Sequence, residues 1–343
     1  MQRRRWRRDG AGRSSRYTGH EGPLPVVATL ILLLTFSAAC ALESPTLSIP
    51  SQRRIVPKQL RVRVTENGRT AVRQVPLEEY VHAAILSEFA PAAGDATVVE
   101  RMLQVQAVIS RTYAMSHLGR HARDGYDLCA TTHCQLFEPA RRRTSRWAGA
   151  AADAVRKTSG VVLLFDREPA TALFHADCGG HTSTPTAVWG GTPHAYLRAR
   201  ADDGPAERAH TTWRYDATQD AIRLALNADA RTGVGARLEA LTVLERDDAG
   251  RATRVRLKGQ QTREVTGEVV RDALTRAFGV RSIKSTWFAI RKQRTSFVFE
   301  GRGFGHGVGL CQAGALARIE AGTAPSAVLL RYFPGTRLTR VQP

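Results

Sequence analysis

GRGFGHGVGLCQAGA, residues 301–315, has a glycine at every second position from Gly301 to Gly309. An extended segment with this spacing lacks side chains on one face, which weakens a strand unless another backbone or a ligand approaches closely. Apolar residues before the run and a helix-like pattern after it predict a strand, a tight loop and a helix start. His306 and Gln312 therefore lie at a candidate site, with a mobile glycine loop as the alternative. The glycines fit neither the dinucleotide-binding nor the phosphate-loop motif.

The rest of the chain combines helical and hairpin patterns. Alternating apolar and polar residues flank Asn67-Gly68, a strong hairpin signal, and a second hairpin is predicted across 248–250. Three helices are predicted, at about 76–88, 97–118 and 268–278. Because strands and helices do not alternate regularly, we expect an α+β fold in which helices and antiparallel hairpins form a substrate cleft.

The N-terminal residues have the pattern of an export signal. Seven arginines precede residue 17, residues 22–42 carry no charge, and the small-residue run SAAC ends at Cys40. We therefore expect an exported protein of the cell envelope, periplasmic or on the cell surface. Cys40 is a candidate for lipid attachment. Ordinary cleavage near Ala39 or Ala41 and an uncleaved membrane anchor are the alternatives.

The predicted organisation has three parts. Residues 1–40 are the export signal or lipoprotein leader, residues 41–58 are a linker rich in proline and serine, and residues 59–343 are the folded domain. A sub-boundary is predicted near 201–218, where charged and turn-forming residues interrupt the pattern. The part after the leader is long enough to bury a sizeable core.

The charge of the chain indicates anionic partners. Lys and Arg total 50 against 31 Asp and Glu, which gives a net charge of +19. An exported protein of this charge is attracted to anionic cell-wall polymer or to a membrane surface. Nucleic acid is the competing partner. We expect no nucleic-acid binding, because the arginines are scattered and no recognisable nucleic-acid module is present.

Glu88 is the most informative carboxylate. It follows Ala84 by four residues and Val81 by seven, so it continues the apolar face of the predicted helix. It also lies at the helix C-terminus, where the helix dipole disfavours an anion. Burial and the dipole both favour the protonated form, which is the form that general-acid catalysis uses. The alternative is a structural glutamate paired with an arginine such as Arg111.

Four cysteines lie in the predicted folded domain. Cys129 and Cys134, with His133 and the upstream His121, offer two thiolates and two imidazoles, a set suited to structural Zn²⁺. The spacing fits no standard zinc motif, so a Cys129–Cys134 disulfide and free thiols stay open as alternatives.

The chain resembles the SpoIID/LytB family of bacterial cell-wall proteins in six segments that occur in order. These segments are VPLEEYVHAAILSEFAP (75–91), VQAVISRTYAM (105–115), TTHCQLFEP (131–139), SGVVLLFDREPATALFHADCGGHT (159–182), STWFAIRK (285–292) and the glycine-rich segment. The better-known members are lytic transglycosylases of peptidoglycan, and others are partners or modifiers of amidases. The resemblance implies that Glu88 is the catalytic residue, and some members hold zinc where the Cys129 region lies. It also implies that the loops with Cys178 and Cys311 meet, which makes these two residues a candidate cross-link.

A single catalytic carboxylate favours one reaction over another. A hydrolase needs a second carboxylate, for which only Asp127 and Asp177 are candidates, and each also suits a turn or loop. N-acetylmuramic acid supplies its own C6 hydroxyl as nucleophile, so one acid/base suffices. We therefore expect a lytic transglycosylase that cleaves the β-1,4 bond between N-acetylmuramic acid and N-acetylglucosamine and leaves 1,6-anhydro ends.

The expected ligands follow from this function. Arg111 could hold Glu88, contact the glycan, or form a purely structural ion pair. The expected substrate-binding residues are Arg111, His175, Gly305, His306, Gly307 and Gln312. The expected partners are peptidoglycan strands, with or without stem peptides, and an amidase. The alternative function is a non-catalytic glycan-binding module that recruits or modifies a cell-wall amidase.

Overall fold

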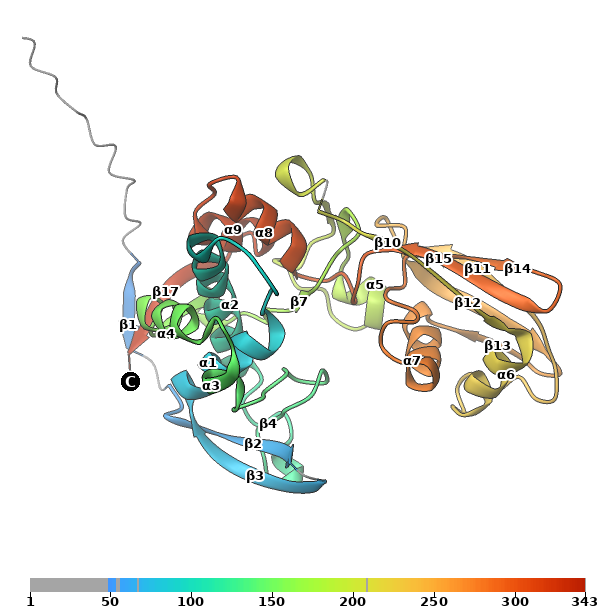
Figure 1. Ribbon diagram of the computed structural model, residues 1–343, viewed down its shortest axis with the longest axis horizontal. Helices are drawn as coiled ribbons and strands as arrows, with labels where there is room; N and C mark the ends of the chain where they lie inside the picture. The colour runs from blue at the N-terminus through green and yellow to red at the C-terminus, as the bar shows by residue number, and fades with distance from the viewer. Residues whose placement is uncertain (1–48, 54–55, 67, 208, 343) are drawn as a thin grey trace, which may run out of the picture. The chain divides into compact units, whose positions relative to one another are not determined.

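The computed structural model describes residues 49–53, 56–66, 68–207 and 209–342, and residues 48–343 form one unit by their contacts (Figure 1). It confirms the predicted α+β class. The helices are α1 (Leu77–Glu88), α2 (Ala96–Ser116), α3 (Arg141–Thr144), α4 (Ala148–Lys157), α5 (Pro185–Trp189), α6 (Gln219–Asn227), α7 (Gly267–Phe278), α8 (Gln312–Glu320) and α9 (Pro325–Tyr332), with 3₁₀ turns at Ala122–Asp124 and Gly204–Ala206. The strands are β1 (Ser51–Arg53), β2 (Gln59–Glu66), β3 (Arg69–Pro76), β4 (Leu128–Cys129), β5 (Val161–Phe165), β6 (Glu168–Pro169), β7 (Phe174–His175), β8 (His181–Thr182), β9 (Arg200–Ala201), β10 (Thr212–Thr218), β11 (Leu238–Arg246), β12 (Ala252–Gly259), β13 (Thr262–Val265), β14 (Phe288–Lys292), β15 (Ser296–Arg302), β16 (Leu310–Cys311) and β17 (Arg337–Gln342).

The predicted leader, residues 1–40, lies outside the described residues, as do residues 41–48 of the predicted linker. Within the described residues, no helix is long and apolar enough to cross a membrane. The linker prediction needs one correction: β1 forms inside it and pairs in parallel with β17. The backbone N–H of Arg340 donates to the carbonyl of Pro50 at 2.8 Å. Because an unpaired strand edge leaves backbone groups unsatisfied, β17 recruits this segment as its neighbour.

Both predicted hairpins form, as do the three predicted helices. β2 pairs antiparallel with β3 from Gln59↔Pro76 to Glu66↔Arg69, and β11 pairs antiparallel with β12. The turn after β11 includes Gly250 with φ +83°. The longer sheets have the strand orders β1-β17-β5-β6, β10-β15-β14, β11-β12-β13 and β3-β2-β4. Among the described residues the parallel pairings are short, and one of them, β16 with β7, places Cys311 beside His175.

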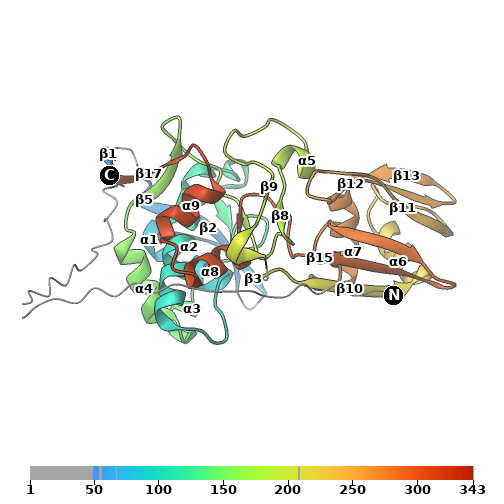
Figure 2. The same cartoon turned by 90° about the horizontal axis from the view of Figure 1, so that it is seen from above.

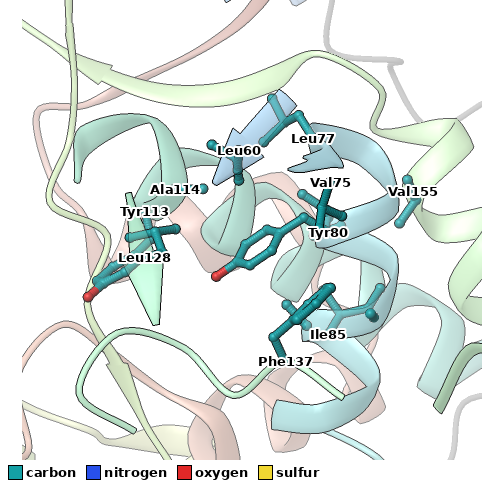
Figure 3. Packing of buried hydrophobic residues seen from close by; sticks show 14 of the residues in the cluster. Leu60, Val75, Leu77, Tyr80, Ile85, Tyr113, Ala114, Leu128, Phe137 and Val155 are labelled. Carbon is teal, nitrogen blue, oxygen red and sulfur yellow. The ribbon is translucent and has the colours of Figure 1, made fainter. Parts of the chain in front are cut away.

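Helix α2 is the centre of the first two core clusters. Asp95 begins it, because its carboxylate accepts a hydrogen bond from Val98 N at 2.9 Å. One face packs with α1, α4 and β2, and Figure 3 shows Tyr80 of this cluster beside Phe137, with ring centroids 5.1 Å apart. The other face packs against β5, α8 and α9. It presents the residues predicted to share a face, namely Met102, Val105, Val108 and Ile109. Each fully buried side chain of this size contributes roughly 1.5–3 kcal/mol.

A third cluster forms from residues between Trp213 and Phe299. Helices α6 and α7 supply Ile222, Leu226, Val270 and Leu274, while β10 to β15 supply apolar residues that include Phe288 and Phe297. Figure 2 shows this set of antiparallel strands and two helices as a group distinct from the helices around α2. The glycine-rich segment leaves this group at the end of β15 and enters α8.

Arg111 and Glu78 connect α2 with the first turn of α1. The guanidinium donates to both carboxylate oxygens, at 2.7 and 2.6 Å, and Arg111 Nη1 donates to Val161 O at 3.0 Å. The side chain of Arg111 is 0% exposed and that of Glu78 is 41% exposed. A charge buried this fully is stable only while its partner is present.

Glu78→Ala is expected to lower the free energy of unfolding by about 3 kcal/mol, because it leaves the Arg111 guanidinium buried without a carboxylate. Glu79→Ala is the matched control. Glu79 lies in the same helical turn and is 40% exposed, but its partner Arg142 is 29% exposed. Its loss should cost less than about 1 kcal/mol. Urea unfolding of both variants checks this, and equal losses would contradict the role given to burial.

Candidate functional site

Glu88 is the last residue of α1, and it is half-buried. Its carboxylate Oε1 accepts a hydrogen bond from the backbone N–H of Leu136 at 2.6 Å. Among the described residues, no arginine, lysine or histidine forms an ion pair with it. Burial raises the pKa of Glu88 to about 7, and the hydrogen bond from Leu136 lowers it by less. The group is therefore a carboxylic acid that holds its proton near neutral pH.

The loop that contacts Glu88 is fixed to α1 by three hydrogen bonds. Besides the bond from Leu136, Tyr80 donates its hydroxyl to Gln135 Oε1 at 3.0 Å, and the N–H of Glu138 donates to Ser87 Oγ at 3.0 Å. Gln135 is fully buried, so this loop has little freedom to shift. The carboxyl group of Glu88 is thus held by a short rigid segment.

Gln312 reaches Glu88 from the other end of the chain. Its side-chain amide donates to the carbonyl of Glu88 at 3.3 Å and to Gln106 Oε1 at 3.2 Å. It is the first residue of α8 and follows the alternating glycines of residues 301–309. The prediction that Gln312 and Glu88 belong to one site therefore agrees with their contact, although the amide holds the backbone of Glu88 rather than facing solvent.

Arg111 does not belong to this site. Its guanidinium is bound to Glu78 and to carbonyl oxygens, and no part of its surface is exposed. Of the roles considered from the sequence, only the structural ion pair matches this geometry. The sequence could not show which glutamate pairs with Arg111. Glu78 and Glu88 lie at opposite ends of the same helix, and both are acids near α2.

The glycine-rich segment packs against protein atoms. A Cβ atom on Gly303 would lie 2.7 Å from the carbonyl of Asp177, and one on Gly305 would lie 2.9 Å from the Cβ of His175. At Gly301, Gly307 and Gly309 the nearest atoms belong to Trp213, Arg251 and Leu173. The expectation that sugar approaches Gly305 and Gly307 on this face is therefore wrong. The glycines are required because a neighbouring backbone and the Arg251 side chain occupy the space of their side chains.

His175 and His306 lie together beside this segment. Their ring centroids are 5.4 Å apart, and the ring of Trp189, which is 49% exposed, lies 5.0 Å from that of His306. Burial and the neighbouring His175, Arg271 and Arg251 hold the pKa of His306 well below its usual range, so the imidazole is neutral. His306 Nδ1 accepts from Val308 N at 3.0 Å, and His175 is buried. Trp189 is thus the exposed part of this group, and His306 is half-buried.

His121, Cys129, His133 and Cys134 form the first cysteine cluster, and their ligand atoms lie within 4.8 Å of one another. The distance from His121 Nε2 to Cys134 Sγ is 3.3 Å, and His133 Nδ1 lies 3.7 Å from both sulfurs. Zinc bonds of about 2.0–2.3 Å place the ligand atoms of a tetrahedral site roughly 3.3–3.8 Å apart. The donor set and these distances fit such a site. Asp124 Oδ2, 3.7 Å from His121 Nδ1, is placed to orient that ring.

Asp177, Cys178, His210 and Cys311 form the second cysteine cluster, again with ligand atoms within 4.8 Å of one another. The sequence indicated Cys178 and Cys311 as a cross-link, but all four described cysteines are free thiols. His210 was missed because it lies in a charge-rich segment without a motif. Burial opposes protonation of His210, but its hydrogen bond with Asp177 raises the pKa to about 10.

The arrangement around Glu88 is a candidate acid–base site within an α+β fold, and part of the chain matches known protein families. Residues 65–165 match the family described as "SpoIID: Stage II sporulation protein", and residues 205–309 match "Domain of unknown function (DUF8618)". The first match includes Glu88 and the first cysteine cluster. Residues 65–165 therefore match the SpoIID family, in agreement with the resemblance seen in the sequence.

Individual relatives extend this likeness beyond the domain. The chain is 24% identical to Stage II sporulation protein D of Bacillus subtilis (strain 168), over 80% of this chain and 78% of the relative. Its identity with Stage II sporulation protein D of Bacillus amyloliquefaciens is 23%, over 81% and 78%. It is 25% identical to the amidase enhancer of Bacillus subtilis (strain 168), over 69% of this chain but only 38% of that protein.

Glu88→Gln is expected to remove a pH dependence of stability. An unfolded glutamate ionises near pH 4.5, whereas folded Glu88 keeps its proton to about pH 7. The unfolded state therefore binds fewer protons between these values, so the wild type loses up to about 3 kcal/mol as pH rises through this range. Urea unfolding at about pH 4 and about pH 8 should show the variant gaining stability relative to wild type at the higher pH. If the free energies of unfolding of variant and wild type differ by the same amount at both pH values, a raised pKa of Glu88 is contradicted.

Gly303→Ala is expected to cost about 2–4 kcal/mol of stability, since φ is +76° and the new Cβ meets the backbone of Asp177 and Gly179. Gly322→Ala is the control. Gly322 has φ +90° but open space around its Cβ position, so about 1 kcal/mol is expected there. Thermal or urea unfolding separates the two, and similar losses would show that backbone conformation alone requires the glycine.

Proposed function

We propose that this protein is a peptidoglycan lytic transglycosylase with Glu88 as its acid and base. The observation that carries the proposal is a half-buried carboxyl group with a pKa of about 7 and no cationic partner in the described part of the chain. A structural glutamate in a helix would gain stability from a cation, as Glu78 does from Arg111. An acid that keeps its proton at neutral pH is the form required to protonate a leaving oxygen.

The proposed reaction needs two proton transfers at one carboxyl group. Protonated Glu88 donates its proton to the glycosidic oxygen as the bond from that oxygen to C1 of N-acetylmuramic acid breaks. The resulting carboxylate accepts the proton of the C6 hydroxyl as O6 bonds to C1, which gives the 1,6-anhydro end and restores the acid. The N–H of Leu136 stabilises the intervening carboxylate. No second carboxylate is required, unlike in a hydrolase.

Substrate contacts in this proposal fall on the exposed part of the site. The half-exposed indole of Trp189 beside His306 offers an aromatic face and a neutral imidazole, which suit a sugar ring and its hydroxyl groups. Gln312 is a positioning residue, because its side-chain amide donates a hydrogen bond to the carbonyl of Glu88. His175 is buried and supports His306.

We also propose that the first cysteine cluster holds a structural zinc ion through His121, Cys129, His133 and Cys134. Four protein ligands close such a site, so the ion would supply folding energy rather than chemistry. Cys134 directly precedes Gln135 and Leu136, which contact α1. The ion would therefore hold the loop that positions the carboxyl group of Glu88.

An alternative function is supported by the relative named amidase enhancer. In this case the domain binds glycan strands and stimulates or recruits a cell-wall amidase without cleaving them. Either function places the protein in the cell envelope, in agreement with the names of its relatives and with its net charge of +19. Peptidoglycan strands, with or without stem peptides, are the proposed substrate. Attachment of the protein to the membrane through a lipid on Cys40 stays a proposal.

Glu88→Gln is expected to reduce formation of anhydro-ended products by roughly 10²- to 10⁴-fold while glycan binding stays intact. Mass analysis of products from purified strands, with and without peptides, measures this. Glu138→Gln, an exposed acid of the neighbouring loop, is the control and should cleave like wild type. The wild-type kcat/KM should also fall as pH rises above about 7, because the acid form of Glu88 is lost.

Two results would contradict the enzyme proposal. A wild-type product with a reducing, hydrolytic end would mean that a second carboxylate acts. No cleavage by wild type, together with equal stimulation of a peptidoglycan amidase by wild type and the Glu88→Gln variant, would favour the amidase-enhancing function.

A further inference from the structure

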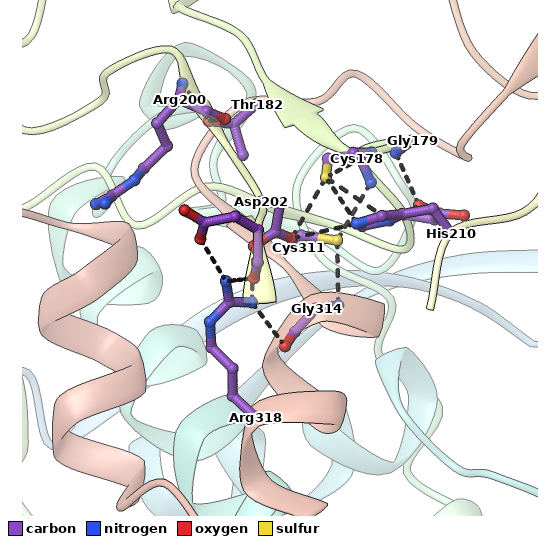
Figure 4. A network of polar contacts seen from close by, with 12 residues as sticks. Cys178, Gly179, Thr182, Arg200, Asp202, His210, Cys311, Gly314 and Arg318 are labelled. Carbon is purple, nitrogen blue, oxygen red and sulfur yellow. Dashed lines mark hydrogen bonds and ion pairs between the residues drawn. The ribbon is translucent and has the colours of Figure 1, made fainter. Parts of the chain in front are cut away.

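The second cysteine cluster is built from segments that are far apart in the sequence. Cys178 follows β7, His210 precedes β10, and Cys311 ends β16. Figure 4 shows their side chains converging, with Asp202 and Arg318 beside them. Both cysteines are 0% exposed, and the His210 side chain is 3% exposed. These two buried thiols and the imidazole have no role in the proposed glycan chemistry.

Asp177 holds His210 in place. Its carboxylate accepts from His210 Nδ1 at 2.7 Å and from the N–H groups of Gly179 and Thr211 at 2.8 Å each. The Thr211 hydroxyl donates to it as well, at 2.9 Å. With four hydrogen bonds the carboxylate has little capacity left to bind an ion. Histidines that bind zinc through one ring nitrogen commonly donate a hydrogen bond from the other ring nitrogen to a carboxylate. Asp177 is such a carboxylate for His210.

Asp202 is the better placed carboxylate. Its Oδ2 lies 3.4 Å from Cys178 Sγ and 3.8 Å from His210 Nε2, close to the spacing of tetrahedral zinc ligands. Its Oδ1 is held by Arg318 at 2.7 Å, and the hydroxyl of Tyr332 donates to the same carboxylate. Asp202 is 2% exposed, so these partners fix its orientation.

The surroundings can accommodate the charge of a metal site. One Zn²⁺ with two thiolates and one carboxylate carries a net charge of −1. Arg318 is bound to Asp202, and Arg251 Nη2 donates to the carbonyl of Cys178 at 2.7 Å.

His175 has a buried Nε2 without a hydrogen-bond partner, and His175 and Cys311 are adjacent in the β7–β16 pairing. The Cys311 thiol also caps α8 by accepting from Gly314 N, a role that a thiolate keeps.

We propose that the second cysteine cluster binds one structural zinc ion, with Asp202 as the fourth ligand in place of Asp177. The ligands are then Cys178, Asp202, His210 and Cys311. On binding, the ion replaces the protons of both thiols and of His210 Nε2, and it has no open position for substrate. It would tie the start of the strand group that begins at β10 to the start of α8, and so to Gln312 and Glu88. This inference does not depend on the proposed glycan reaction.

Metal analysis of the full chain tests the proposal, and the first cysteine cluster provides a matched background. In the Cys129→Ser/Cys134→Ser protein we expect about one zinc per chain. Adding Cys178→Ser and Cys311→Ser should remove it, and serine at 311 preserves the cap of α8. Equal zinc content in the two proteins would overturn the proposal.

Two measurements keep the test decisive if the fourfold variant fails to fold. In wild type, a strong chelator should increase the alkylation rates of Cys178 and Cys311, as measured by peptide mapping under native conditions. Unchanged rates, or a Cys178–Cys311 disulfide recovered without reductant, would overturn the proposal. Asp177→Asn retains every ligand and should weaken zinc binding roughly 10- to 100-fold in chelator competition. Unchanged affinity would contradict the orienting role of Asp177.

Discussion

The absence of side chains at alternate positions of residues 301–309 is the constraint on which the arrangement of this protein depends. It lets the segment run beside the backbone of residues 173–179 and over the buried guanidinium of Arg251. Reciprocal hydrogen bonds between Asp177 and Phe304, at 2.9 and 2.7 Å, fix the register. From there the chain enters α8 with Gln312 against the end of α1. A Cβ at Gly303, Gly307 or Gly309 would displace the neighbouring backbone or the Arg251 side chain.

The candidate acid site depends on a different property, the partial burial of the Glu88 carboxyl group. Helix α1 carries two acids at its start, where the helix dipole favours them, and one at its end, where the dipole disfavours it. Glu78 gains a buried arginine, whereas Glu88 gains only the N–H of Leu136. The same helix therefore contains a carboxylate held in an ion pair and a candidate catalytic carboxyl group whose pKa burial raises to about 7.

The two cysteine clusters both combine two cysteines with histidine, and they lie in different parts of the chain. The first gathers its four side chains from within one loop region, between His121 and Cys134. The second draws on three distant segments, so an ion there would stabilise long-range order rather than a local loop. The matched region at 205–309 contains His210, while Cys178 and Cys311 lie outside it on either side. The second cluster thus lies where that region joins the rest of the chain.

The sequence by itself predicted the main elements and the candidate acid of the main site. Periodicity predicted both hairpins and the helices around Glu88, because these patterns depend on near neighbours. The face of Glu88 and its place at a helix end predicted its raised pKa, and the presence of two cysteines and two histidines between residues 121 and 134 predicted the first cluster. Tertiary structure alone decided the contacts between distant residues. It paired Arg111 with Glu78, filled the glycine face with protein rather than sugar, and brought His210 and Asp202 to Cys178, since no local pattern records which separate segments pack together.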